Sequence, residues 1–320
     1  MILRLGEIYD FIIQQGIATD PRSRALTKKK LTETKREHRK LSRLQKTLFD
    51  PDSLKNPYAD TRILYGDRAA EIKRVLVGID IEVGEVLLAD RLSQKGKKID
   101  LIIAHHPEGK ALAGLHDVMG LQADLLVQLG FKPEIAKDLM AKRIGEVARR
   151  LHSGNHTRSV DAAKLLNFPL LCCHTPSDNH VAKYLQRLMD AKKPRNLQEV
   201  VNLLLQEPEY QDAVVQKAGP KILLGKPKDK AGKILVDMTG GTEGSKEIFS
   251  RISQAGIDTL LCMHLSEEHF SRVKPEHINV IVAGHVASDN VGMNLLLDKL
   301  ERKGRFEFLE CSGFKRVRRA

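Results

Sequence analysis

Three short apolar segments of the sequence are each followed by residues of the types that bind metal ions. The segments are residues 100–104, 169–173 and 279–283. Open parallel sheets bind ligands outside the carboxyl ends of their strands, so side chains that follow three strands can meet at one edge. The candidate ligands at these positions are His105, His106, His174, Asp178, His285 and Asp289.

The mixture of imidazole and carboxylate groups indicates a transition-metal site. These groups suit zinc, iron, manganese, nickel or cobalt, and they do not fit an all-oxygen calcium site. Six ligands are more than one tetrahedral ion needs, so we expect two divalent transition-metal ions per chain. His105 and His106 leave a strand in different directions, so each can face a different ion. The spacing of four from His to Asp, found twice, puts both side chains on one side of a loop that enters a helix.

Each candidate ligand taken alone has a simpler interpretation. A single histidine at a strand end is commonly a hydrogen-bonded loop residue. Asp178 and Asp289 each precede a stretch with helical spacing, so both could be helix N-caps. The coincidence of three strand ends, two of them with the same spacing, favours the metal site.

A glycine-rich segment at residues 237–245, "DMTGGTEGS", follows one predicted strand and precedes a predicted helix. This position suits a phosphate bound at a helix N-terminus. The order of residues after Gly244 is Ser then Lys, which is not the order of a P-loop. A plain tight turn is the alternative interpretation, and we favour it.

Two further groups of polar residues remain open. His264 and His269 follow another apolar segment and either support the metal ligands or lie on the surface; we favour the surface. A basic group in a predicted loop either binds an anionic substrate near the site or is solvated. Its members are Arg149, Arg150, His152, His156 and Arg158.

Apolar runs that alternate with helical patterns predict an α/β protein with mainly parallel sheets. We expect strands at residues 74–80, 100–104, 169–173, 234–237, 259–263 and 279–283. We expect helices at residues 5–15, 82–93, 121–129, 133–151, 159–166, 181–189, 197–205, 246–255, 267–272 and 290–303, the first ended by Gly16. Because both halves show this alternation, we expect two similar α/β lobes that meet at a cleft.

The expected division of the chain has three parts. Residues 1–66 form an N-terminal helix with a basic extension, residues 67–205 the first α/β lobe and residues 206–320 the second. A Gly-, Lys- and Pro-rich stretch at residues 219–233 predicts a hairpin or a connection between lobes.

The net charge of +12 is concentrated in two segments. Residues 21–47 contain eleven Lys or Arg against two Glu, and residues 314–320 add four more basic residues. The first segment can bind nucleic acid or another anionic partner through its positive charge. The alternative, which we favour, is a solvated helical arm that sets solubility or packs on a neighbouring subunit. In either case we expect residues 21–47 to be dispensable for the fold.

Composition points to the cytoplasm. No run of 18 apolar residues occurs, so we expect neither a signal peptide nor a membrane span. The four cysteines lack metal-finger or redox spacing, and three lie in apolar runs, which indicates core residues in a reducing compartment.

Four sequence elements together carry a family resemblance: "KRVLVGID", "IDLIIAHHP", "HTPSDN" and "VAGH" four residues before an acid. Across roughly residues 60–310 the chain resembles the NGG-interacting-factor-like family, also called GTP cyclohydrolase one, type two homologues. The resemblance implies two similar lobes, a metal pair in the cleft between them, and a ring-like homohexamer. It assigns the six candidate ligands above to that metal pair. Asp289 stands where the family usually has Glu, and residues 20–50 have no clear counterpart.

Two classes of function follow. The first is a metal-dependent hydrolase, in which the ions lower the pKa of a bound water and polarise the bond that is attacked. The resemblance points to a nucleotide-like small molecule as its substrate. The alternative is a non-enzymatic metal-binding or adaptor protein that acts through partner or nucleic-acid contacts.

Overall fold

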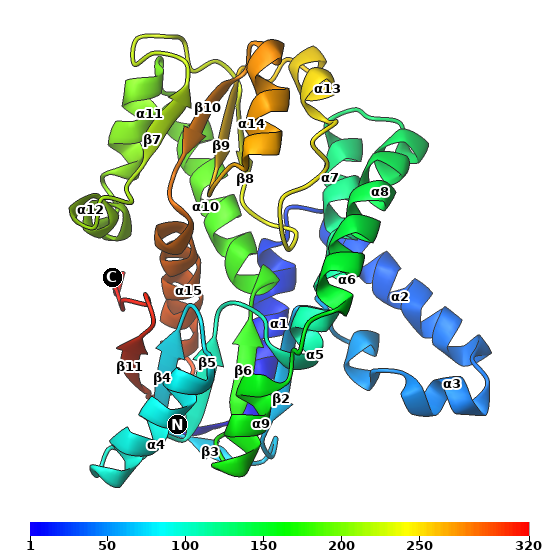
Figure 1. Ribbon diagram of the computed structural model, residues 1–320, viewed down its shortest axis with the longest axis vertical. Helices are drawn as coiled ribbons and strands as arrows, with labels where there is room; N and C mark the ends of the chain where they lie inside the picture. Colours follow the sequence, from blue (N-terminus) through cyan, green and yellow to red (C-terminus); the bar gives the residue numbers. More distant parts are fainter. Residues whose placement is uncertain (320) are drawn as a thin grey trace.

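The computed structural model describes residues 1–319, which form two mainly parallel β-sheets covered by helices (Figure 1). The predicted α/β class is therefore confirmed. Within the described residues, no helix combines the length and the apolar character needed to cross a membrane.

The first sheet has five strands in the order β11-β4-β5-β6-β2. All neighbours are parallel except β2, which runs antiparallel to β6. The bounds are Thr61–Tyr65 for β2, Arg74–Gly78 for β4, Leu101–Ala104 for β5, Leu170–Cys173 for β6 and Glu307–Cys311 for β11. The parallel register aligns Ala104 with Gly78 and with Cys172, so β4, β5 and β6 end at the same edge.

The second sheet has four strands in the order β7-β10-β9-β8, with β7 antiparallel to β10. The bounds are Lys221–Leu224 for β7, Ile234–Asp237 for β8, Thr259–Cys262 for β9 and Asn279–Val282 for β10. A hairpin or a connection between lobes was expected at residues 219–233. This expectation is wrong for residues 221–224, which form strand β7 of the second sheet. β7 is an edge strand whose residues alternate between exposed and half-buried, so it has no fully apolar run to reveal it. A third, two-stranded sheet pairs β1 (Leu3–Arg4) with β3 (Glu71–Ile72).

Helices cover both faces of the first sheet. On one face lie α4 (Val83–Gln94), α5 (Gly109–Ala113) and α9 (Arg158–Leu165). On the other lie α1 (Leu5–Thr19) and the C-terminal half of α15 (His285–Glu301). Because successive strand residues point to opposite faces, Leu76 packs on the first set while Val75 and Val77 pack on the second. This two-sided burial explains the continuous apolar runs in the sequence.

The second sheet is also covered on both faces. One face packs on α10 (Thr175–Lys192), α11 (Leu197–Leu204), α12 (Pro208–Val215) and the start of α15. The other packs on α7 (Gly120–Gln128), α8 (Pro133–His152) and α13 (Phe249–Gln254). The remaining helices are α2 (Arg24–Lys40), α3 (Arg43–Leu48), α6 (Leu115–Val118), α14 (Glu267–Val273), and the 3₁₀ turns η1 (Pro51–Leu54) and η2 (Lys274–Glu276).

Several helix boundaries differ from the sequence prediction. α1 continues past Gly16 to Thr19, because Gly16 serves close packing and does not end the helix: a Cβ there would lie 2.8 Å from Pro176. α10 and α15 begin several residues earlier than predicted, so Asp178 and Asp289 lie inside helices and neither is an N-cap. Their early turns are polar, and the apolar spacing that predicts a helix starts later.

The three-part division of the chain stays a prediction. The long helices α10 and α15 pack against each other; α15 belongs to the cores of both sheets, and α10 packs on the second sheet and on α1. After α15 the chain returns to the first sheet as β11, beside β4. The basic segment 21–47 forms most of α2 and α3, which project from the side of the molecule (Figure 1). Its beginning is buried: Arg22 is 6% exposed, so dispensability of the whole segment is not expected from the structure.

Candidate metal centre

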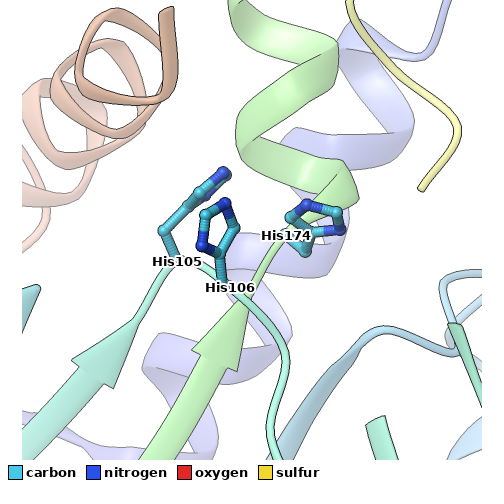
Figure 2. Close-up of side chains that lie close together, drawn as sticks. All are labelled: His105, His106 and His174. Carbon is cyan, nitrogen blue, oxygen red and sulfur yellow. The ribbon is translucent and has the colours of Figure 1, made fainter. Parts of the chain in front are cut away.

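The six predicted ligands come together at the facing ends of the two sheets. Figure 2 shows His105 and His106 on the loop after β5 and His174 where β6 meets α10. His285 and Asp289 lie in the first turns of α15, which follows β10 of the second sheet. Gly284 joins β10 to α15 with φ of +106°, and a Cβ there would lie 2.7 Å from the Ala218 carbonyl oxygen. Glycine at this position therefore allows the chain to turn and present His285.

Asp289 lies at the centre of the cluster. Its Oδ1 is 3.3 Å from His105 Nε2, and its Oδ2 is 3.6 Å from both His106 Nε2 and His285 Nε2. Asp178 approaches the same nitrogen of His105, with Oδ1 3.5 Å from His105 Nε2. Three overlapping groups have ligand atoms within 4.8 Å of one another: His105, His106 and His174; His106, His285 and Asp289; His105, Asp178 and Asp289.

The Nδ1 atoms of three histidines are held by acceptors outside the cluster. His105 Nδ1 lies 3.2 Å from the Cys173 carbonyl oxygen, which can only accept a hydrogen bond. His106 Nδ1 lies 2.7 Å from Asp80, and His174 Nδ1 lies 2.9 Å from Asp60. With Nδ1–H donating to these acceptors, each Nε2 lone pair faces the cluster, as in metal-binding histidines.

Asp60 and Asp80 belong to the candidate site, and the sequence analysis missed both. Asp80 ends the segment "RVLVGID" one strand away from His106, so its place after a predicted strand was a usable signal. Asp60 precedes β2, which was not predicted as a strand, so the sequence held no local sign of its position. Asp60 is fully buried and also accepts a hydrogen bond of 2.6 Å from the Thr175 hydroxyl.

Buried polar atoms without hydrogen-bond partners show that the cluster fits a cation. Among the described residues these atoms include His105 Nε2, Asp178 Oδ1 and both carboxylate oxygens of Asp289. An unpaired buried polar group costs about 1–3 kcal/mol, and a charged one costs more. Since all these atoms are electron-pair donors that face one another, a divalent cation would satisfy them together.

The pKa values in the cluster reflect burial and crowded charge. Burial lowers the pKa of His105 to about 4, which keeps its imidazole neutral and able to bind a metal at neutral pH. Burial raises the pKa of Asp178, and the neighbouring carboxylates of Asp289 and Asp60 raise it further. Burial also opposes ionisation of Asp289, but the surrounding histidines outweigh it and lower its pKa to about 2. A cation would relieve the repulsion among these carboxylates.

A pocket opens beside the cluster, and His174, Asp178 and His285 form part of its wall. Most residues of the glycine-rich segment 237–245 also line it. The tight-turn interpretation fits this segment: Gly240 and Gly241 have positive φ, and Gln122 donates to the Gly240 and Thr242 carbonyl oxygens. The segment does not open a helix directly, because α13 begins only at Phe249.

The remaining candidates, His264, His269 and the basic group, lie at different distances from the cluster. The His264 ring centroid lies 4.8 Å from that of His285, and Glu243 lies 3.4 Å from His264 Nδ1, so His264 adjoins the cluster. The surface placement expected for His269 is wrong: it is 6% exposed and contacts the Gly244 carbonyl oxygen. The predicted loop of the basic group is also wrong in part. Arg149, Arg150 and His152 belong to α8, and no member of the group lines the pocket.

Residues 145–312 match the family model Duf34/NIF3 (NGG1p interacting factor 3). The chain belongs to the Duf34/NIF3 family. The matched region is more than half of the chain and includes His174, Asp178, His285 and Asp289. The resemblance found from sequence elements is thereby confirmed.

Solved structures agree with this Duf34/NIF3 assignment. A NIF3 superfamily protein from Sphaerobacter thermophilus is 26% identical, with a TM-score of 0.75 over 98% of this chain and 100% of that one. Reduced HcgD from Methanocaldococcus jannaschii has the same fold at 15% identity, with a TM-score of 0.51 over 82% of this chain and 93% of that one. Comparison with curated proteins found no match.

Proposed function

We propose that this Duf34/NIF3 protein binds two divalent transition-metal ions and is a metal-dependent hydrolase. The observation that carries the proposal is the set of buried, unpaired ligand atoms on His105, Asp178 and Asp289. Folding desolvates these atoms and gives them no partner within the described chain. A protein retains such a cluster when a bound cation supplies the missing interactions.

The arrangement of Asp289 supports two ions over one. Its two oxygens face different histidines: Oδ1 faces His105, and Oδ2 faces His106 and His285. A carboxylate with this disposition suits a ligand shared by two ions. His174 and Asp178 would then supply further ligands for the first ion, since His174 Nε2 lies 3.7 Å from Asp178 Oδ2. Imidazole and carboxylate ligands fit zinc, iron, manganese, nickel or cobalt.

The adjacent pocket supports hydrolysis of a small molecule. Bound ions would lower the pKa of a coordinated water and would polarise the bond that is attacked. The residues of the chain hold the ligands rigid through Asp60 and Asp80 and leave His106 and His285 partly exposed towards solvent. A nucleotide-like substrate remains the finer proposal. The carboxylates of Asp237 and Glu243 in the wall favour contact with its hydrogen-bond donors over its phosphates.

The test is elemental analysis combined with turnover. Untagged protein purified without chelator should contain about two transition-metal ions per chain, and His285→Ala should lose at least one. His264→Ala is the matched control, because the His264 ring lies beside that of His285 but His264 belongs to none of the three ligand groups. Hydrolysis of nucleotide-like compounds should disappear in His105→Ala. Metal binding without turnover on a broad hydrolase panel would instead support the non-enzymatic metal-binding or adaptor function.

We further propose that the protein forms a homohexamer and that it is located in the cytoplasm. The hexamer rests on the family resemblance. The location agrees with the burial of Cys172, Cys173 and Cys262, whose thiol pKa values burial raises. Light scattering after gel filtration should give six times the chain mass of 35.9 kDa. A monomer at micromolar concentration would contradict the hexamer and leave the metal proposal to its own test.

A further inference from the structure

The two basic segments of the chain differ in how their charges are used. In the C-terminal tail, all four basic side chains from Lys315 to Arg319 lie within 3.1 Å of a carboxylate oxygen. These ion pairs fasten the tail to α12 and α15. The positive charge of the tail is therefore neutralised by its own protein and is not free for an external anion.

Helix α2, in contrast, carries positive side chains that are not all paired with carboxylates. Four of its basic residues have exposed side chains and take part in no ion pair within residues 1–319. These four residues, called the α2 stripe below, are Arg24, Lys28, Lys35 and Arg39. Other basic residues of the same helix are paired: Lys29 with Glu33, and Arg36 and Lys40 with Glu37.

The spacing of the α2 stripe places all four cations on one face. Successive members are four, seven and four residues apart, so at 100° per residue they lie within about 60° of one another. At a rise of 1.5 Å per residue the stripe is about 22 Å long. The paired residues Lys29, Arg36 and Lys40 lie on a neighbouring face, so the helix separates its free cations from its neutralised ones.

A third face of α2 anchors the helix to the body. Thr27 is fully buried, and Lys30 lies 2.7 Å from Asp124. Just before the helix, buried Arg22 pairs with both Asp20 and Asp124. The helix is thus fixed along its first half and projects from the side of the molecule (Figure 1), and the side chains of the stripe are exposed. Because folding fixes the helix backbone, the spacing of the cations is set before binding, which favours binding of an extended anion.

We propose that the α2 stripe binds the phosphate backbone of a nucleic-acid duplex without reading its sequence. A duplex presents closely spaced phosphates over the length of the stripe, and each neutralised phosphate releases counterions. Within α2 and α3 the only aromatic ring is that of His38, which packs against Phe49, so stacking on unpaired bases has no platform. The leucines of α2 are half-buried against the body, so α2 has no exposed apolar face for a lipid surface.

The test compares two triple variants of the full-length protein. Lys28→Gln, Lys35→Gln and Arg39→Gln together remove three stripe cations. Lys29→Gln, Arg36→Gln and Lys40→Gln remove three paired cations from the same helix and give the same net charge. The probes are two unrelated 25-base-pair DNA duplexes, a single strand of the same length and vesicles containing phosphatidylserine, each titrated between about 50 and 200 mM salt.

We expect the wild type to bind both duplexes with similar affinity and a steep salt dependence. The stripe variant should lose about tenfold in affinity or more and about three units of the slope of log affinity against log salt. The paired-charge variant should keep most of both. Equal losses in the two variants, absence of duplex binding at about 50 mM salt, or binding to the vesicles alone would each overturn the proposal. Tighter binding to the single strand than to either duplex would overturn it as well.

Discussion

The cluster depends on residues that hold its histidines as much as on the histidines themselves. Each of three Nδ1 atoms has one acceptor, and two of these acceptors are aspartates from segments remote in sequence. Such partners fix the ring orientation and make the facing nitrogen a better ligand. A ligand side chain without them would spend part of its time pointing away from the ion.

Replacement of Asp60 or Asp80 by Asn should therefore weaken metal binding while leaving all six ligands in place. We expect a loss of about 10–100-fold in affinity for each variant, because the carboxylate that orients His174 or His106 is gone. Competition titration with a chromogenic chelator measures this. The Asp80 variant guards against misfolding, since its side chain is 60% exposed. Asp161→Asn, an exposed carboxylate on α9, is the control, and equal affinities in all proteins would contradict the prediction.

Glu243 should make the free energy of unfolding depend on pH in the acid range. Burial opposes its ionisation, but hydrogen bonds from His264 and from the Ser266 backbone N–H outweigh burial and lower its pKa to about 2. Because this pKa is below the unfolded value of 4.5, the stabilisation is present above pH 4.5 and is lost as the pH falls towards 2. Urea unfolding of wild type and Glu243→Gln should differ most above pH 5, and the difference should shrink between pH 4.5 and 2.5. A constant difference across that range would contradict this assignment.

At the scale of elements, the connection from strand to helix decides where each ligand points. β6 runs into α10 through its N-cap residue His174, and β10 into α15 through Gly284, so both His-to-Asp pairs lie at helix starts. Residues four apart on a helix lie on the same face, which places His174 beside Asp178 and His285 beside Asp289. The spacing of four seen in the sequence thus has its physical reason in two helix starts.

Gly284→Ala tests this connection. The new Cβ would approach the Ala218 carbonyl oxygen to 2.7 Å at a φ of +106°, so the turn must shift and move His285. We expect loss of at least one metal ion and a destabilisation of about 1–3 kcal/mol. Gly256→Ala is the matched control: its φ is +75°, and a Cβ there meets nothing within 4 Å. The control should lose stability without losing metal, and loss of metal from both variants would show that the effect is general.

At the scale of the whole molecule, the proposed ions join the two sheets. His105, His106 and His174 follow strands of the first sheet, whereas His285 and Asp289 follow a strand of the second. Ions held by both sets would bind only the folded protein with its sheets in place. Bound metal would therefore add to the stability of the whole chain by mass action.

Removal of metal should lower the melting temperature. At a free ion concentration 100 times the dissociation constant the expected stabilisation is about 2.7 kcal/mol, which for a protein of this size is roughly 4 °C. Differential scanning calorimetry with and without chelator measures the shift, and re-addition of Zn²⁺ or Mn²⁺ should restore it. The His105→Ala and His285→Ala double variant should show little response to chelator. An unchanged melting temperature in the wild type would contradict the proposed link between the sheets.

The sequence by itself determined the α/β class and the six candidate ligands. Strand and helix periodicities are local, and a ligand that directly follows a buried strand is recognisable without knowing its neighbours. The glycine-rich turn and the burial of Cys172, Cys173 and Cys262 belong to the same kind of local information.

Only the tertiary structure decided which groups meet. Asp60 reaches His174 because β2 pairs with β6, and Asp80 reaches His106 because β4 neighbours β5. The same is true of charge: the sequence counts the basic residues of α2 and of the tail alike, but packing pairs the tail with acids of α12 and α15 and leaves the α2 stripe free. Strand order and side-chain pairing join residues far apart in the chain, and a local pattern carries no record of such contacts.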